Sequence, residues 1–175
     1  IRQAQREGVA VSGEATPHHL ALCDEDVRPD DSNFKMSPPL RTRNDRAALR
    51  EAVADGTLQA LATDHAPRPA AEKALGFSAA PFGIVGLETA VGVTYTVLVK
   101  GGLMSVEAWL QRWTSGPAAV LDRPPPSIRP GTPANLSVLD LSSEWTVDAE
   151  QFASQSRNTP FQGHTLVGRA ICTMR

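Results

Sequence analysis

The stretch Leu58–Pro69, LQALATDHAPRP, holds the strongest clue to the fold. Apart from Gln59, its first six residues are small or apolar, a composition typical of a strand buried in a parallel sheet. The run ends at an acid and an imidazole, Asp64 and His65, and two prolines then exclude a regular element. Because an unpaired carboxylate is costly where a buried strand ends, Asp64 is a candidate functional residue. The alternative is that Asp64 caps the turn and His65 is a supporting or core histidine.

Segments on both sides of this stretch predict alternating strands and helices. Val9–Gly13 is typical of a short buried strand, and residues 45–55 of a helix that Asn44 caps and Gly56 stops. The other predicted elements are helices over residues 1–8, 86–100, 105–113 (capped by Ser105) and 116–121, with a long loop before Val85.

This order predicts an α/β fold with a parallel sheet, in which the long loops follow the strands. In (β/α)8 barrels of the TIM type, loops at the carboxyl ends of the strands build the active site. A whole barrel takes about 250 residues, so residues 1–122 are expected to form its carboxyl-terminal part.

A change of composition near Arg123 predicts a domain boundary. Residues 122–131 are too rich in proline for a helix or strand, so residues 123–175 are predicted to be a linker and a small β region. Strands are expected over residues 134–141, 145–147 and 165–173. The chain opens within a helix and closes within a strand, which indicates a piece of a longer protein.

Composition excludes several classes of partner. The chain has 175 residues, 41% of them hydrophobic, and can bury roughly 70% of its unfolded surface. The net charge of -2 comes without a basic block, so nucleic acid and membrane surfaces are poor candidate partners. No apolar run approaches the ~20 residues of a membrane span. Cys23 and Cys172 lack the spacing of a zinc knuckle or disulfide framework, which favours the reducing cytoplasm.

Two further segments carry candidate site residues. His18 and His19 are adjacent, and in extended chain their side chains would point to opposite faces. At most one of them is then expected to enter a site, and a structural role is favoured. Lys35–Arg41 is either a rigid loop that carries Ser37 and Arg41 toward a pocket or an ordinary loop stiffened by prolines.

A third segment, Pro81–Glu88, is rich in glycine. Its backbone amides could approach a ligand, or it could simply form the turn that precedes a helix.

The order of five motifs resembles that of the dihydroorotases, class I type, in the amidohydrolase superfamily. Only the Asp-His-Ala-Pro motif is specific by itself, but the ordered set covers nearly the whole chain. The motifs are Glu14–Leu20, Lys35–Arg41, Thr63–Pro67, Phe82–Thr89 and Asn158–Gly163.

The resemblance implies a zinc-dependent cyclic amide hydrolase of de novo pyrimidine (UMP) biosynthesis. Such enzymes interconvert N-carbamoyl-L-aspartate and (S)-dihydroorotate on a barrel flanked by a β-sandwich. Asp64 matches the family aspartate that ligates metal and shuttles the proton of a bridging water. Phe82 and Gly83 match positions whose backbone contacts the substrate. His18 and His19 belong to a family motif but do not match its metal ligands.

The chain departs from the family pattern at three places. The family's other metal ligands, including a His-Xaa-His pair, lie upstream of Ile1, so this fragment alone is not expected to form a binuclear Zn²⁺ site or to be active. Ser37 stands where the family usually has a substrate-binding asparagine, and Arg68 where it usually has histidine. Arg68 could instead bind a substrate carboxylate in bidentate fashion.

Other functions fit the same residues. The chain could belong to a catalytically silent, dihydroorotase-like subunit that scaffolds aspartate transcarbamoylase, or to a hydantoinase-like or allantoinase-like hydrolase. A partial barrel leaves strand edges uncovered, so association, including a homo-oligomer, or poor solubility is expected of the isolated chain.

Overall fold

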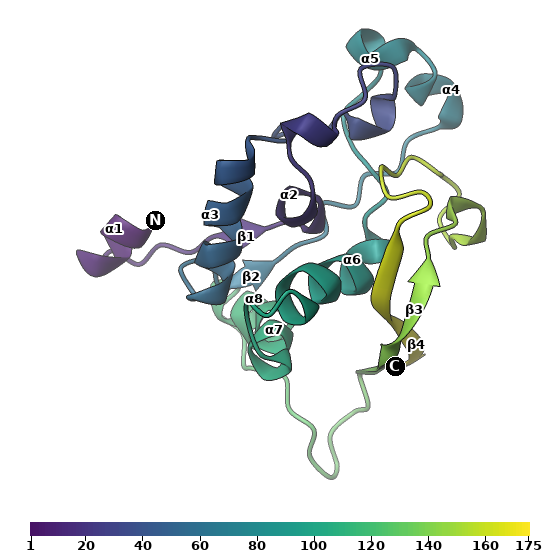
Figure 1. The fold of residues 1–175 in the computed structure, drawn as a ribbon. Helices are drawn as coiled ribbons and strands as arrows, with labels where there is room; N and C mark the ends of the chain where they lie inside the picture. Colours follow the sequence, from purple (N-terminus) through teal and green to yellow (C-terminus); the bar gives the residue numbers. More distant parts are fainter.

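Parallel strands lie at the centre of the computed structural model, which describes residues 1–175 (Figure 1). Strand β1 (Glu14–Ala15) pairs in parallel with β2 (Ala60–Leu61). Beyond β2, a parallel bridge joins His65 to Ile84. Three successive segments therefore run side by side in one direction, as in a parallel α/β sheet.

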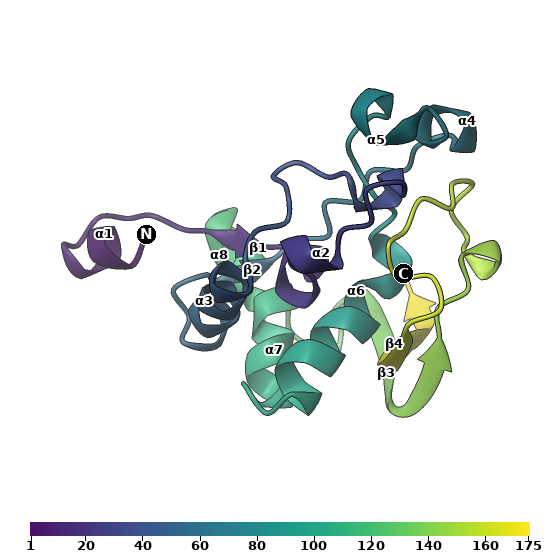
Figure 2. The ribbon, with the colours of Figure 1, turned by 45° about the horizontal axis from the view of Figure 1, so that its top comes forward.

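Helices follow these segments and pack around them (Figure 2). Helix α3 connects β1 to β2, α6 follows Ile84, and α7 and α8 pack against β2. The helices are α1 (Arg2–Arg6), α2 (Pro17–Ala21), α3 (Arg43–Ala54), α4 (Ala70–Lys73), α5 (Gly76–Ala79), α6 (Leu87–Thr94), α7 (Val106–Trp113) and α8 (Ser115–Val120). A π-helical turn over Tyr95–Lys100 extends α6, and short 3-10 turns lie at Asp24–Asp26, Ser32–Phe34 and Ala149–Gln151.

The first predicted strand was misplaced. Regular pairing begins at Glu14 rather than at Val9, whose side chain is 54% exposed. Helix α1 projects away from the body (Figures 1 and 2), so Val9 has no packed layer to enter. The second predicted strand, residues 58–63, is paired only at Ala60–Leu61.

The predicted cap of α3 was wrong as well. Thr42, not Asn44, precedes the helix: its Oγ1 accepts from the Asp45 backbone N–H, and the Asp45 carboxylate accepts from the Thr42 backbone N–H. This capping box satisfies two backbone donors, whereas Asn44 already lies inside the helix. Ser105 caps α7 as predicted, accepting from the Ala108 N–H.

The predicted loop between Asp64 and Val85 contains two short helices, α4 and α5. The predicted helices over residues 86–100 and 105–113 are confirmed as α6 with its π turn and as α7. A buried hydroxyl joins them, because the indole N–H groups of Trp109 and Trp113 both donate to Thr94 Oγ1.

The carboxyl-terminal region is a two-stranded antiparallel ribbon, β3 (Leu136–Thr146) with β4 (Thr165–Met174). The two strands predicted over residues 134–141 and 145–147 are one strand with an irregularity between them, where Asp140 Oδ1 accepts from the Ser142 and Ser143 N–H groups. The ribbon packs against α6 (Figure 1).

The core spans both predicted domains. Ile84 and Val93 share one apolar cluster with Val147 and Phe161 from the β region. Between them, residues 123–135 have no helix or strand and are exposed throughout. Residues 123–135, which we call the linker, are thus an exposed irregular connection, and the division into domains stays a prediction.

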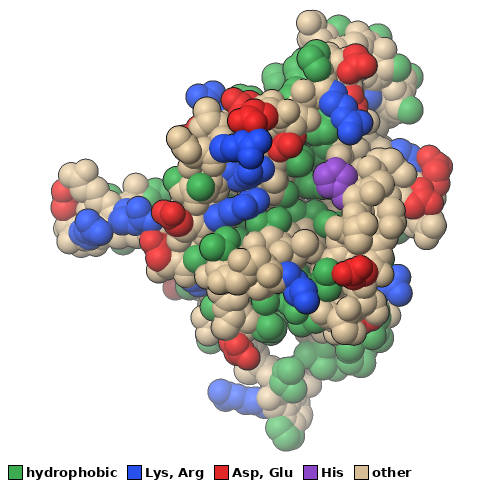
Figure 3. Space-filling view, viewed as in Figure 1, with side chains coloured by type: hydrophobic (Ala, Val, Ile, Leu, Met, Phe, Trp, Pro, Cys, Tyr) green, Lys and Arg blue, Asp and Glu red, His purple; other side chains and the backbone are tan.

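The surface carries charges of both signs. Figure 3 shows basic and acidic side chains interspersed over the face that contains α3. None of the helices is long and apolar enough to cross a membrane.

Candidate active site at the carboxyl ends of the strands

Asp64 follows β2 by three residues, at the carboxyl edge of the parallel pair. Its φ of 48° lies in the left-handed region, which aspartate tolerates better than most residues. Its side chain is 48% exposed, so the carboxylate can reach a ligand. Residues in this region of backbone conformation cluster at functional sites, and the role of Asp64 stays a prediction.

The adjacent histidines lie on α2 rather than in extended chain. Thr16 Oγ1 caps this helix by accepting from the His19 backbone N–H, and Pro17 takes its first position. The rings stay close, with centroids 4.4 Å apart, but only His18 turns inward. His18 is 1% exposed, and its Nε2 lies 3.9 Å from Asp64 Oδ2.

The buried imidazole of His18 is electrostatically unusual. Desolvation, and secondly the neighbouring His19, lower its pKa to about 3, so the ring is neutral near pH 7. Neither ring nitrogen has a hydrogen-bond partner in the chain.

His19 has a structural role. Its Nδ1 lies 2.6 Å from Thr16 Oγ1, and its Nε2 lies 2.9 Å from the Pro38 carbonyl oxygen. These contacts tie α2 to the loop that carries Ser37. The Ser37 side chain is exposed and makes no hydrogen bond within the chain, which leaves its hydroxyl free for a ligand.

The Phe82–Gly83 segment lies beside the same loop. The Gly83 N–H donates to the Lys35 carbonyl at 3.0 Å, so this amide is already occupied. Gly83 has a φ of 121°, and a Cβ added here would lie 2.6 Å from Ala66 Cβ, so glycine is required for the close approach. The Phe82 ring is 52% exposed, and Lys35 Nζ lies 4.9 Å from its centroid.

Arg68 reaches the same segment from the loop that follows Asp64. Its Nε donates to the Phe82 carbonyl at 3.1 Å, and its backbone N–H donates to Asn158 Oδ1 at 3.1 Å. Its terminal guanidinium nitrogens have no partner in the chain and can still donate to an anion.

Asn158 links the segment that contains Ala66 to the segment that contains Gly83, a role that the sequence did not assign. Its buried Nδ2 donates to the carbonyls of Ala66, at 3.2 Å, and Gly83, at 3.0 Å. Its backbone carbonyl accepts from the Val85 N–H at 2.8 Å. The only signal in the sequence was its place in the last of the five motifs, because its partners lie more than 70 positions away.

His65 supports the structure, as the alternative interpretation proposed. Its Nδ1 accepts from the backbone N–H groups of Gly86 and Leu87, at 3.1 and 3.3 Å, where α6 begins. This places the proton of the neutral ring on Nε2. A Cβ on Gly86 would lie 2.6 Å from the Thr63 carbonyl oxygen, so the segments pack closely here as well.

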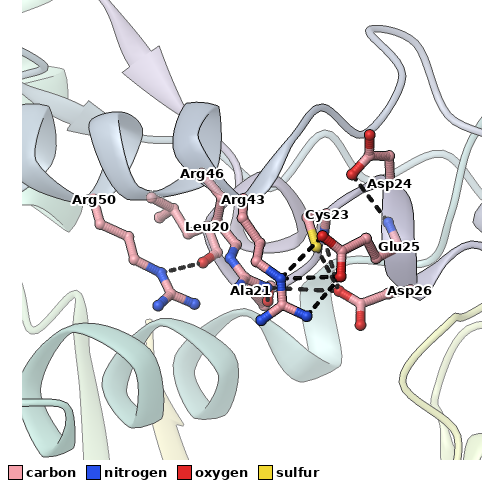
Figure 4. Close-up of polar contacts among 9 residues, drawn as sticks. All are labelled: Leu20, Ala21, Cys23, Asp24, Glu25, Asp26, Arg43, Arg46 and Arg50. Atoms are coloured by element: carbon pink, nitrogen blue, oxygen red, sulfur yellow. Dashed lines mark hydrogen bonds and ion pairs between the residues drawn. The ribbon is translucent and has the colours of Figure 1, made fainter.

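Arginines on α3 fix the carboxyl end of α2 (Figure 4). Arg50 Nε donates to the Leu20 carbonyl at 2.7 Å, and Arg46 Nη1 donates to the Ala21 carbonyl at 3.0 Å. Cations are favourable at helix carboxyl ends. Burial, and secondly Arg46, lower the pKa of Arg50. The same face carries the ion pairs Arg43–Glu25 at 2.6 Å and Arg46–Asp26 at 3.6 Å.

The chain does not form a complete metal site. No group of three or more His, Cys, Asp or Glu side chains comes together, whereas a zinc site uses three or four protein ligands. Asp64, an accessible carboxylate, is suited to supply one ligand. Further ligands would have to come from outside these residues.

Solved structures of a hydantoinase and a dihydropyrimidinase share this fold. An L-hydantoinase (dihydropyrimidinase) from Arthrobacter aurescens superposes with a TM-score of 0.90 at 31% identity, over 99% of this chain and 40% of that one. A dihydropyrimidinase from Brevibacillus agri superposes with a TM-score of 0.88 at 24% identity, over the same shares, which supports the fold alone.

The chain belongs to the amidohydrolase family, which it matches over residues 2–171. It is 49% identical over 173 residues to a dihydroorotase from Bacillus caldolyticus and 45% identical over 174 residues to one from Halalkalibacterium halodurans. These matches cover 99% of this chain but only 40% and 41% of the relatives. The resemblance to dihydroorotases and the α/β amidohydrolase fold are thus confirmed.

Proposed function

We propose that this chain is the carboxyl-terminal part of a dihydroorotase that interconverts N-carbamoyl-L-aspartate and (S)-dihydroorotate in pyrimidine biosynthesis. The observation that carries the proposal is the meeting of the five motifs around one strand edge. Hydrogen bonds link His19 to Pro38, Gly83 to Lys35, Arg68 to Phe82, and Asn158 to Ala66 and Gly83, while Asp64 lies beside His18.

Residues 1–122 would then belong to the barrel, and residues 123–175 would be a linker and part of a β-sandwich. The relatives' greater length leaves room for the strands and metal ligands that this chain lacks.

Asp64 is the proposed metal ligand and catalytic residue. In the complete protein, a pair of bound Zn²⁺ ions would supply a water whose pKa is lowered toward about 7. The Asp64 carboxylate would accept the proton of the attacking water and deliver it to the ring nitrogen that leaves. Its exposure at the end of β2 supports this role, because both transfers need contact with substrate.

Ser37, Arg68, Phe82 and Gly83 are the proposed substrate-binding residues. Dihydroorotate carries a carboxylate, and the free guanidinium nitrogens of Arg68 can bind it in bidentate fashion. Phe82 offers an exposed ring, and Gly83 allows its segment to approach Ala66. Ser37 supplies a short hydroxyl that can donate or accept.

A hydantoinase-like activity is the second candidate. It is supported by the similarity to the Arthrobacter aurescens hydantoinase, and it would keep the hydrolytic chemistry while changing the ring.

The test is hydrolysis of dihydroorotate by the full-length protein supplied with Zn²⁺, beside hydantoin as competing substrate. Asp64→Asn should lower kcat by a factor of about 10² to 10⁴, because proton transfer is lost. Asp30→Asn, an exposed carboxamide change, is the matched control and should leave kcat unchanged. Normal turnover by Asp64→Asn would contradict the role of Asp64, and faster hydrolysis of hydantoin would favour the second candidate.

A further inference from the structure

We propose that His18 is a positioning residue that orients the Asp64 carboxylate through its Nε2–H group. This inference rests on the proposed function only in taking Asp64 as a metal ligand.

The burial of His18 has no structural explanation within the chain. Its side chain is 1% exposed, and both ring nitrogens lack a hydrogen-bond partner. A buried polar group without a partner costs free energy that an apolar side chain of similar size would not. An imidazole at this position therefore points to a role outside packing.

The geometry directs that role toward Asp64. Nε2 of His18 lies 3.9 Å from Asp64 Oδ2, only about 1 Å beyond the length of an N–H···O hydrogen bond. A small rotation of the half-exposed carboxylate would close this gap. The contact would engage Oδ2 and leave the other carboxylate oxygen for a metal ion.

Both partners are held by their surroundings. Helix α2, which carries His18, is fixed by Arg46 and Arg50 at its carboxyl end (Figure 4). Asp64 precedes His65, whose ring anchors the backbone at the start of α6. A hydrogen bond between two such anchored groups loses little conformational freedom when it forms.

No other histidine lies as a possible ion-pair partner against the Asp64 carboxylate. His19 uses both ring nitrogens on Thr16 and Pro38, and His65 uses Nδ1 on the α6 backbone. His164 lies against Phe161, with ring centroids 5.5 Å apart. Only His18 combines free ring nitrogens with proximity to Asp64.

The experiment compares His18→Leu and His18→Gln in the full-length protein. Substitution of a residue that hydrogen-bonds a metal ligand typically lowers metal affinity or activity by 10- to 100-fold. His18→Leu should therefore raise the Zn²⁺ dissociation constant, measured by chelator competition, by about 10- to 100-fold. His18→Gln should recover part of the loss through its amide donor, and His164→Gln, the matched control, should bind Zn²⁺ as the unsubstituted protein does.

The melting temperature of the metal-free protein separates positioning from packing. His18→Leu should keep or raise it, because leucine removes an unpartnered polar group. Unchanged Zn²⁺ affinity in His18→Leu would overturn the inference, and so would a lowered metal-free melting temperature without a change in affinity. If His18→Leu does not fold, His18→Gln is compared with His18→Met, which has a similar size but no donor. A Zn²⁺ affinity of His18→Gln above that of His18→Met supports the donor role. An affinity of His18→Gln far below that of His18→Met supports packing and overturns the inference.

The outcome for the proposed function is separate. If the unsubstituted protein binds Zn²⁺ but does not hydrolyse dihydroorotate, the proposed function fails. The inference about His18 is then still decided by the Zn²⁺ affinities of its variants. A protein that binds no Zn²⁺ would overturn both.

Discussion

The loop after Asp64 and the linker over residues 123–135 have similar compositions but different structures. Both are rich in proline and small residues, and both were predicted as irregular. Residues 66–85 form two short helices and hydrogen bonds to distant segments, whereas residues 123–135 are exposed and contact little. The difference lies in a few buried polar side chains, above all Asn158 and Lys73, that bind the first loop's carbonyls. Composition therefore predicts an irregular segment but not whether that segment packs against the rest of the chain.

Of the substitutions that test this difference, Asn158→Ala should lower the free energy of unfolding most. It removes the three side-chain hydrogen bonds to Ala66, Arg68 and Gly83. Leaving buried groups unpaired costs about 1–3 kcal/mol each, so we expect a loss of about 3 kcal/mol in the free energy of unfolding, measured by denaturant titration. Asn135→Ala in the exposed linker is the matched control, with an expected change within about 0.5 kcal/mol. Equal effects of the two variants would contradict the role of Asn158.

Gly83→Ala should have the next largest effect. The new Cβ would lie 2.6 Å from Ala66 Cβ, at a φ of 121°. Strain and overpacking together predict a loss of about 2 kcal/mol in the free energy of unfolding, measured by denaturant titration. Gly131→Ala in the linker has a φ of 82° but meets nothing within 4 Å, so it should cost only the backbone term of about 1 kcal/mol. A smaller loss of stability for Gly83→Ala than for Gly131→Ala would show that the segments of Gly83 and Ala66 are not in close contact.

Lys73→Met should have the smallest effect and should alter the pH dependence of stability. Desolvation, and secondly Lys35, lower the pKa of Lys73 in the folded protein. The unfolded chain then binds the proton more tightly, so the free energy of unfolding should rise with pH between the lowered value and about 10.4. The rise can be followed as an increase of the melting temperature with pH. Lys73→Met should flatten this increase, and Lys100→Met, at an exposed position, should not. A rise that persists in Lys73→Met would assign it to another group.

Local signals in the sequence predicted much of the fold. Apolar runs and caps located the helices over residues 86–100 and 105–113, and the apolar run before Asp64 located a parallel strand. The errors arose where two local signals competed. Thr42 and Asn44 can both cap a helix, and only Thr42 forms a reciprocal box with Asp45. Thr16 and Pro17 signalled the start of α2, but the pair of histidines was interpreted as extended chain.

The sequence by itself determined the α/β order, the family and the candidate role of Asp64, because hydrophobic periodicity and motif order are local or ordered along the chain. Only the tertiary structure decided which histidine faces Asp64 and how Asn158 joins two loops. Both depend on contacts between residues far apart in sequence, His18 with Asp64 and Asn158 with Gly83. Such contacts are selected by burial and hydrogen bonding in the packed molecule, which leave no periodic trace in the sequence.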